Sequence, residues 1–359
     1  MPNDLLFSPL ELGPTHLANR VVMAPMTRSR SINNVPGEIA ATYYAQRAEA
    51  GLIVTEGTSP SPNGLGYPRI PGLFNAAQVA GWKRVTDRVH AAGSKMFVQL
   101  MHTGRIGHPA NLPPGGRVLG PSAVPTSEKM FVDPDGPQPI PTAIAMTAED
   151  IEYAIEEYAA SSVLAIEAGF DGVELHGANG YLIDQFFNAA SNRRTDEWGG
   201  PVANRIRFAL EVCKRVEKHL GHDRLGIRLS PFGAFNAMAP DGAPEELYEL
   251  LACELSKLGL VYIHLVDHSS MGAPPVPPTV KLKIRAAFTG KLILSGGYDR
   301  ARAEHDLSEN LGDLIAFGRP FLANPKLVTR LRENQPLRAP DFATFYTPGE
   351  KGYTDYPLD

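Results

Sequence analysis

The chain has 359 residues, of which 43% are hydrophobic and 20% are charged, and its net charge is −5 at pH 7. This composition is typical of a globular protein and excludes extensive disorder, and the negative charge offers no basic field for nucleic acid. Two cysteines, Cys213 and Cys253, are too few for a disulfide scaffold and favour a reducing cytoplasm. No apolar run of about 18 residues predicts a membrane span.

Short apolar runs rich in β-branched residues recur along the chain. They cover residues 21–25, 52–55, 95–100, 172–176, 225–229, 260–266, 291–294 and 313–317. A glycine precedes seven of them, as expected for a left-handed residue just past a helix end: Gly51, Gly93, Gly169, Gly221, Gly259, Gly290 and Gly312. Strands that alternate with helices eight times predict an α/β fold, a (β/α)8 TIM barrel.

Helical patterns stand ahead of two of these glycines. Asn75 is a predicted N-cap, with Gln78 placed to reach back, and apolar residues follow at helical spacing: Val79, Trp82, Val85 and Val89. Thr147 opens a second helix, and its buried stripe is predicted to be Ile151, Ile155, Tyr158, Ser162 and Ile166. Residues 7–13 with Leu17 alternate like a small hairpin, which we expect at the barrel floor.

The segment between residues 107 and 146 contains many prolines, which exclude a long helix. It leaves the carboxyl end of the third strand, so we expect an excursion over the barrel mouth that forms part of the wall of a site there. No interdomain linker is evident. Residues 1–359 are therefore predicted to form one domain.

Polar or small residues stand at the carboxyl ends of the predicted strands, where TIM barrels carry their chemistry. Strands seven and eight end in glycine pairs and an arginine suited to a phosphate, namely Gly296, Gly297, Gly318 and Arg319. Thr27, Gln99 and Arg228 offer donors that suit a flat heteroaromatic ring. A buried arginine such as Arg228 requires an anionic or multiply accepting partner.

Three hydrogen-bonding residues follow the fourth strand. His176 and Asn179 are three residues apart, and a short helix here would bring both to one side. Two neutral donors on one side could hold a carbonyl oxygen and stabilise charge that develops on it. The Tyr181 phenol could deliver a proton to an adjacent carbon.

Other readings of the same strand ends remain open at this stage. A metal-dependent hydrolase could use the strand-end residues His102, His176, His264, Asp267 and His268. A glycosidase could use Glu56 and Asp267 as its carboxylate pair, which leaves the phosphate site unused. A non-catalytic barrel that binds a phosphorylated ligand is a third reading.

Ordered sequence motifs along nearly the whole chain resemble the Old Yellow Enzyme family of FMN-dependent ene-reductases. The matching stretches are residues 19–28 (NRVVMAPMTR), 99–105 (QLMHTGR), 173–182 (VELHGANGYL), 191–200 (SNRRTDEWGG), 316–319 (AFGR), 323–325 (ANP) and 352–357 (GYTDYP). The resemblance implies a (β/α)8 barrel with FMN at the carboxyl ends of its strands.

The resemblance also implies roles for individual residues. The flavin ring would contact Pro25, Thr27, Gly57, Gln99 and Arg228, and its phosphate would contact Gly296, Gly297, Gly318 and Arg319. The substrate would contact His176, Asn179, Tyr181, Met101 and Tyr346, with Tyr181 as the proton donor and His176 and Asn179 holding the substrate oxygen. No metal is implied. Met101 stands where several relatives carry tryptophan, which predicts a softer pocket wall.

The resemblance implies a reaction as well. Hydride would pass from NADPH or NADH through flavin N5 to the β-carbon of activated alkenes such as α,β-unsaturated carbonyls, maleimides or nitro compounds. The protein is thus predicted to be a cytoplasmic NAD(P)H-dependent flavin oxidoreductase, a monomer or homodimer with a small-molecule substrate.

Overall fold

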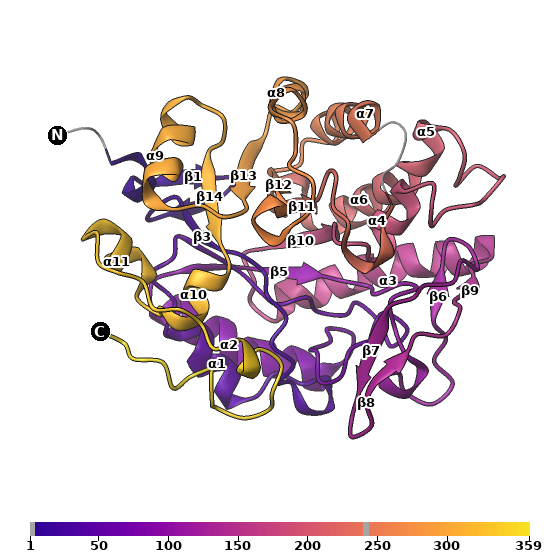
Figure 1. The fold of residues 1–359 in the computed structure, drawn as a ribbon, viewed down its shortest axis with the longest axis horizontal. Coiled ribbons are helices and arrows are strands. Elements are labelled where there is room, and N and C mark those ends of the chain that lie inside the picture. The colour runs from indigo at the N-terminus through magenta and orange to yellow at the C-terminus, as the bar shows by residue number, and fades with distance from the viewer. Residues whose placement is uncertain (1–3, 240–243) are drawn as a thin grey trace.

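The computed structural model describes residues 4–239 and 244–359 and contains a closed barrel of eight parallel strands (Figure 1). Around the barrel the strand order is β10-β11-β12-β13-β14-β3-β4-β5. The strands are β3 (Val21–Met23), β4 (Leu52–Val54), β5 (Lys95–Leu100), β10 (Gly172–Gly177), β11 (Leu225–Leu229), β12 (Tyr262–Val266), β13 (Lys291–Ser295) and β14 (Leu314–Phe317). The predicted fold class and all eight predicted strand positions are confirmed.

Helices surround the barrel on its outside (Figure 1). The longer ones are α1 (Glu38–Ala45), α2 (Ala76–Ala91), α3 (Ala148–Glu167), α6 (Arg207–Leu220), α7 (Pro244–Lys257), α8 (Pro278–Ala287) and α9 (Arg300–Ser308). Shorter ones are α4 (Leu182–Phe187), α5 (Val202–Arg205), α10 (Arg319–Ala323) and α11 (Leu327–Arg332). Single 3-10 turns are η1 (Leu5–Phe7), η2 (Ile32–Asn34), η3 (Pro109–Asn111), η4 (His222–Arg224), η5 (Phe235–Ala237), η6 (His268–Met271) and η7 (Phe342–Thr344).

Both predicted helix starts are confirmed, with two corrections of detail. Thr147 and Asp150 form a capping box at the start of α3. The Asn75 side chain accepts from the Gln78 backbone N–H, but the Gln78 side chain accepts from Phe74 N at 2.8 Å, one residue before the cap. Ile166 is 37% exposed rather than buried, because the end of α3 packs through the neighbouring Ala165 and Ala168, which are fully buried.

The glycines that precede the barrel strands are required for two different structural reasons. Gly93, Gly169, Gly221 and Gly259 have φ between 71° and 95°, as predicted. Gly51 and Gly290 have no positive φ. A Cβ on Gly51 would lie 2.0 Å from the Asn19 carbonyl oxygen, so at this position close packing requires glycine.

The barrel interior has an apolar lower layer closed by the N-terminal hairpin. Strands β1 (Leu10–Leu12) and β2 (Thr15–Leu17) pair antiparallel, which confirms the predicted hairpin. Leu12 and Leu17 are fully buried in one cluster with residues of the barrel strands, among them Val22, Phe97 and Tyr262. A second, larger cluster fills the space between strands and helices. Polar chemistry is therefore confined to the opposite, carboxyl end of the barrel.

The excursion after β5, all of which the structure describes, contains the 3-10 turn η3 and short strands but no long helix, as its prolines predict. The short strands are β6 (Leu119–Gly120), β7 (Lys129–Val132), β8 (Gly136–Pro139) and β9 (Ile144–Ala145). Met130 and Ile140 of the excursion pack against Tyr67 and Tyr181. The excursion thus reaches the segment that follows β10.

Candidate active site

Strand register gathers polar side chains inside the barrel. Glu174 on β10 lies opposite Gln99 on β5, while His176 lies opposite Arg228 on β11. Arg228 in turn lies opposite His264 on β12. Since side chains alternate along a strand, Glu174 and His176 point to the same side. Four neighbouring strands therefore carry one polar layer above the apolar floor.

Glu174 lies in the middle of this layer, and both of its carboxylate oxygens accept hydrogen bonds. Its carboxylate is fully buried and accepts from Gln99 Nε2 at 2.8 Å, the Tyr262 hydroxyl at 3.0 Å and His264 Nδ1 at 2.8 Å. Burial alone would raise the pKa of Glu174, but these hydrogen bonds and the nearby Arg228 lower it below its usual range. A buried carboxylate beside Arg228 keeps the layer close to neutral.

Arg228 has the opposite surroundings. Its side chain is buried at 6% exposure, yet it makes no hydrogen bond or ion pair with the residues that the structure describes, and its Nε is enclosed without an acceptor. Burial lowers the pKa of Arg228, and Glu174 counteracts this. A buried guanidinium with free donors fits a ligand ring that carries several acceptors. This fits the carbonyl oxygens and ring nitrogens of an isoalloxazine.

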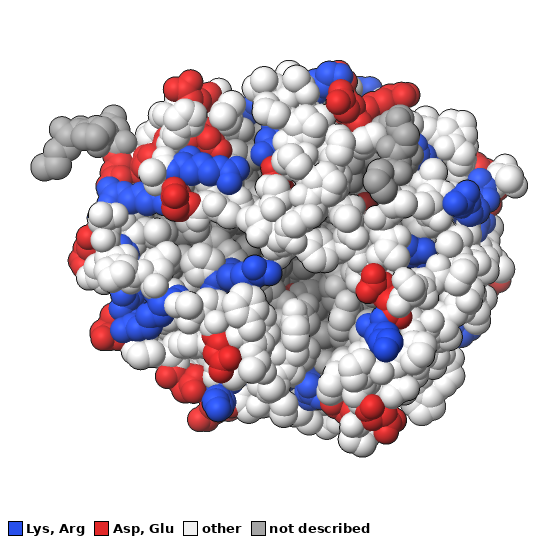
Figure 2. Space-filling view, in the orientation of Figure 1, with Lys and Arg blue, Asp and Glu red and all other residues white. Residues whose placement is uncertain are grey.

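Backbone donors at the ends of β13 and β14 form a second unfilled group. Within residues 4–239 and 244–359, no acceptor pairs with the N–H of Gly296, Gly297, Gly318 or Arg319. A Cβ on Gly296, where φ is +127°, would lie 2.0 Å from the Asp267 carbonyl oxygen. The Arg319 side chain is exposed beside these groups. Converging N–H groups and a guanidinium fit a phosphate, and Figure 2 shows this protein hollowed near the centre of one face, with basic side chains at the edge.

The remaining predicted flavin contacts come from β3 and β4. Pro25 is buried just beyond β3, and Thr27 is half-buried. The Thr27 hydroxyl has no hydrogen-bond partner in the described chain, so it can donate to a ligand. Gly57 lies against Met101, because a Cβ there would be 2.5 Å from the Met101 sulfur. Met101 itself is buried with Leu65 and Ile70.

The segment after β10 brings His176, Asn179 and Tyr181 together, but by a different backbone from the one predicted. His176 lies within β10, and Asn179 adopts a left-handed φ of +60° in the turn before α4. The predicted helix over 176–179 is wrong, because two glycines flank the turn and α4 begins only at Leu182. The His176 and Tyr181 rings lie 5.0 Å apart between centroids.

The protonation states of the pair suit donation of hydrogen bonds. Burial, with Arg228 nearby, lowers the pKa of His176 well below 6.5, so the imidazole is neutral. His176 Nδ1 is buried without a partner. Burial raises the pKa of Tyr181, although a hydrogen bond from Tyr67 counteracts this, so the phenol keeps its proton.

Tyr67 is a site residue that the sequence reading missed. Its hydroxyl lies 3.0 Å from the Tyr181 hydroxyl, and the two rings meet edge to face. Burial raises the pKa of both Tyr67 and Tyr181, and the nearby Tyr346 of the C-terminal segment raises the two pKa values further. The Tyr346 side chain itself is 61% exposed. No sequence motif predicts Tyr67 as a site residue, because it lies in the irregular loop after β4.

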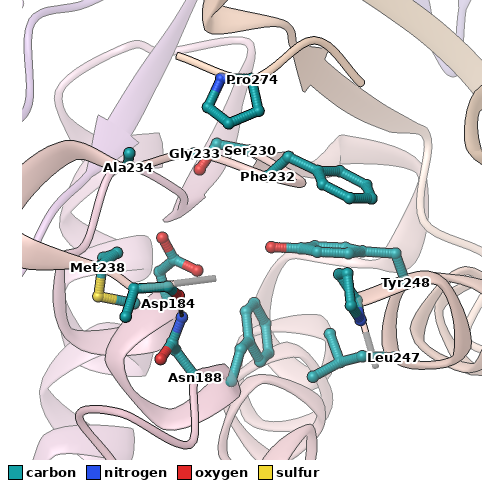
Figure 3. Close-up of a pocket in the computed structure, with 13 residues that line it drawn as sticks. Asp184, Asn188, Ser230, Phe232, Gly233, Ala234, Met238, Leu247, Tyr248 and Pro274 are labelled. Atoms are coloured by element: carbon teal, nitrogen blue, oxygen red, sulfur yellow. Dashed lines mark hydrogen bonds between the residues drawn. The ribbon is translucent and has the colours of Figure 1, made fainter. Parts of the chain in front are cut away.

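A small cavity of about 110 Å³ lies beside this site, behind the turn that carries Asn179. Figure 3 shows Phe232 and Tyr248 on one side of it and Asp184 and Met238 on the other. Burial raises the pKa of Asp184 to about 7, although Gly180 N and Ser230 donate hydrogen bonds to it. The cavity is too small for a flavin, since cofactor pockets span roughly 300–1,000 Å³.

The strand-end histidines do not assemble a metal site. In the part of the chain that the structure describes, no group of three His, Cys, Asp or Glu side chains could hold a metal ion. His264 binds Glu174, His268 binds Asn179, and His102 Nδ1 accepts from Gly104 N. Asp267 is paired with Lys281. The metal-hydrolase reading therefore finds no support.

Comparison with known proteins decides the family. The family model for the NADH:flavin oxidoreductase / NADH oxidase family matches residues 5–338. The chain belongs to this family. Chanoclavine-I aldehyde reductase of Penicillium roqueforti is 44% identical to it over 98% of this chain and 95% of its own length. Morphinone reductase has a TM-score of 0.95 at 43% identity, covering 98% of this chain and 96% of that one.

A further relative is the Old Yellow Enzyme homologue from Zymomonas mobilis, with a TM-score of 0.94 at 39% identity over 98% of this chain and 99% of that one. This flavin oxidoreductase is thus a member of the Old Yellow Enzyme group, and the resemblance found in its sequence is confirmed. It is an FMN-dependent enzyme that takes hydride from a reduced nicotinamide and reduces alkenes. Among its described residues, no helix is long and apolar enough to cross a membrane.

Proposed function

We propose that this enzyme reduces activated alkenes, namely α,β-unsaturated carbonyls, maleimides or nitro compounds, at the carboxyl end of its barrel. FMN held there would supply the redox chemistry, which is hydride transfer from NADPH or NADH through its N5 atom to the substrate β-carbon. The observation that carries the proposal is the buried Arg228 guanidinium, which has no partner in the described chain and belongs to a residue near the carboxyl end of β11.

The residues that hold the cofactor fall into two groups. Arg228 and Thr27 donate to the acceptors of the ring and Gln99 accepts from its N–H, with Gly57 and Pro25 leaving room for its flat face. The Gln99 amide nitrogen is occupied by Glu174, so its Oε1 is the end that remains for the ring. The phosphate is held by four residues with free backbone donors: Gly296, Gly297, Gly318 and Arg319.

His176 and Asn179 hold the electron-withdrawing oxygen of the substrate. Both are neutral donors in a largely dry site, where hydrogen bonds to developing negative charge are strongest. Neutral His176 donates without losing a proton. Charge that develops on the substrate oxygen as hydride arrives at the β-carbon is therefore stabilised by two fixed groups.

Tyr181 donates the proton to the substrate α-carbon. Its raised pKa keeps the phenol protonated until the carbon becomes basic. Tyr67 stays hydrogen-bonded to the Tyr181 oxygen at 3.0 Å and stabilises the phenolate that remains. Met101 and the exposed Tyr346 contribute to the pocket wall and set which substrates enter.

The proposal includes the setting of the enzyme. Residues 1–359 act as one FMN-binding domain, with the excursion over about 107–146 as a wall of the site. Packing of Met130 and Ile140 against Tyr67 and Tyr181 supports this arrangement. We propose that the enzyme is cytoplasmic, which its two cysteines without a disulfide support. We also propose that it is a monomer or a homodimer.

A Tyr181→Phe substitution tests the role of the phenol. Enzyme reduced by NADPH should react with 2-cyclohexenone about 100-fold more slowly in stopped-flow experiments, since general acid catalysis contributes about 10²–10⁴-fold. Reduction of the enzyme by NADPH should stay within about twofold, because that step needs no proton from Tyr181.

Tyr67→Phe is the matched control, since it keeps the Tyr181 hydroxyl and removes only its partner. It should slow the reaction with the enone by roughly tenfold, the value of one hydrogen bond to a charged oxygen. An unchanged rate of reaction with the enone in Tyr181→Phe would refute the proton-donor assignment.

A further inference from the structure

The Asn179 side chain is held by a histidine from a distant part of the sequence. His268 Nε2 lies 2.6 Å from Asn179 Oδ1, although the two residues are 89 positions apart. His268 belongs to η6, directly after β12, and is buried at 6% exposure. The Phe235 ring meets the His268 ring edge to face at 4.6 Å between centroids. The imidazole is therefore fixed in place by packing.

The backbone of the same turn is fixed by other groups. Asn179 N donates to Ser230 Oγ at 2.9 Å, and Asn236 Nδ2 donates to the Asn179 carbonyl at 2.7 Å. Gly180 N donates to Asp184 at 2.8 Å, and Asp184 and Ser230 both line the cavity drawn in Figure 3. These bonds hold the main chain of the turn. The rotation of the Asn179 amide is left to His268.

The hydrogen-bond pattern decides which end of the amide His268 holds. His268 Nδ1 is buried and has no partner in the described chain. A proton on Nδ1 would be an enclosed N–H without an acceptor, which is rarer and costlier than an unused lone pair. The proton therefore sits on Nε2 and is donated to Asn179 Oδ1. The Asn179 Nδ2 group is left without a partner among the described residues.

The charge state of His268 supports the same arrangement. Burial, together with the nearby Arg228, lowers the pKa of His268 to about 3, although Asp267 acts in the opposite direction. The imidazole is thus neutral at any pH at which an enzyme of this kind works. It offers one donor and does not add positive charge to the site.

We propose that His268 is a positioning residue that turns the Nδ2 end of Asn179 toward the substrate oxygen. This inference rests on the proposed function, in which Asn179 and His176 bind that oxygen together. Without His268, the Asn179 amide would be free to present its oxygen to the substrate and repel it. The substrate classes concerned are those with a carbonyl or nitro oxygen conjugated to the alkene.

Three single variants and one double variant test the inference. His268→Phe keeps the ring and removes the donor, while His268→Gln keeps a donor at the position of Nε2. Asn179→Gly removes the amide and tolerates the left-handed backbone. Each protein is reduced with dithionite and mixed with 2-cyclohexenone, and binding of the unreactive cyclohexanone to the oxidised enzyme is measured from the flavin absorbance.

His268→Phe should slow the reaction with the enone by about tenfold and raise the Kd for cyclohexanone by a similar factor, the value of about one hydrogen bond. Asn179→Gly should slow the reaction by about 100-fold, as for loss of an oxyanion donor. In the double variant, His268→Phe should add less than about twofold, because its effect passes through Asn179. His268→Gln should stay within about threefold of the unsubstituted enzyme.

A full tenfold effect of His268→Phe in the Asn179→Gly background would overturn the inference, since His268 would then act independently of Asn179. A His268→Gln variant that folds and reacts as slowly with the enone as His268→Phe would also overturn the inference. If His268→Phe binds no flavin, the result for His268→Gln decides the test. If Asn179→Gly itself reacts at an unchanged rate, the failure lies with the proposed role of Asn179.

Discussion

The buried arginines of this protein differ in whether their side chains have hydrogen-bond partners. Arg28, Arg30 and Arg47 hold the C-terminal segment, residues 344–353, against the barrel, and we call this group the C-terminal latch. Arg47 is fully buried and donates to the carbonyl oxygens of Tyr43, Phe321, Leu322 and Tyr353 at 2.8–3.3 Å. Arg228 is buried as well, yet its donors have no partner in the described chain.

The difference separates structural from ligand-binding arginines. A guanidinium whose donors are all used by carbonyl groups stabilises the fold, since removing it leaves several buried acceptors unpaired. A guanidinium with unused donors in a buried place destabilises the protein until a ligand provides acceptors. The hydrogen bonds of a buried arginine thus indicate its function better than its burial does.

The largest effect is expected from Arg47→Met. Loss of the guanidinium leaves the carbonyl groups of Phe321 and Leu322 without donors, so the free energy of unfolding of the apoprotein should fall by about 4 kcal/mol in urea titrations. Arg88→Met is the matched control. Arg88 pairs with Glu38 on the surface, and its loss should cost under about 1 kcal/mol. Equal losses in the two variants would contradict the structural role of the latch.

Arg228→Met should show the reverse pattern. The affinity for FMN should fall by about 100-fold, or roughly 2.7 kcal/mol, because charge-assisted hydrogen bonds to the ring are lost. The apoprotein should keep its free energy of unfolding within about 1 kcal/mol, because Arg228 makes no side-chain hydrogen bond in the described chain and the lost attraction to Glu174 is offset by relief of the cost of burying the guanidinium. Fluorescence titration with FMN and urea unfolding of the apoprotein measure the two quantities. A loss of apoprotein stability like that of Arg47→Met would remove the distinction.

A pH-dependent effect is expected at Glu56, a buried carboxyl beside the latch. Burial raises its pKa to about 7, although the Arg28 backbone N–H donates to it. Because the folded-state pKa lies above the ordinary value of 4.5, the protonated carboxyl favours folding below pH 4.5, and this advantage is lost as pH rises through 7.

Comparison with Glu56→Gln isolates this contribution, since glutamine does not titrate. Relative to the variant, the unsubstituted protein should lose about 3 kcal/mol of unfolding free energy between pH 4.5 and pH 8. Paired urea titrations at the two pH values provide the difference. A constant difference between the two proteins would show that Glu56 titrates normally.

The fold was largely predictable from sequence because the barrel has strong periodic signals. Apolar runs mark every barrel strand, seven of them after a glycine, and the caps at Asn75 and Thr147 mark two helix starts. Ile166 was wrongly predicted as buried, since spacing along a helix does not tell where the packed face ends. Close approaches such as that of Gly51 to Asn19 depend on tertiary structure and have no local signal.

The residues of the candidate site that lie in sequence motifs were predictable from the sequence. The contacts between side chains from different barrel strands were not. The strand ends identified His176, Asn179 and Arg228 as candidates. The pairing of Glu174 with Gln99, Tyr262 and His264 depends on strand register, which one sequence does not specify. The sequence indicates His268 only as a candidate metal ligand and has no signal for Tyr67, because each is hydrogen-bonded to a residue far away in the chain.

A crystal structure of the protein reconstituted with FMN tests the central claim most directly. The isoalloxazine should lie within hydrogen-bond distance of Arg228 and Gln99, with its phosphate on the backbone N–H groups of Gly297 and Gly318. FMN bound elsewhere, with the Arg228 guanidinium still lacking a partner, would contradict the account.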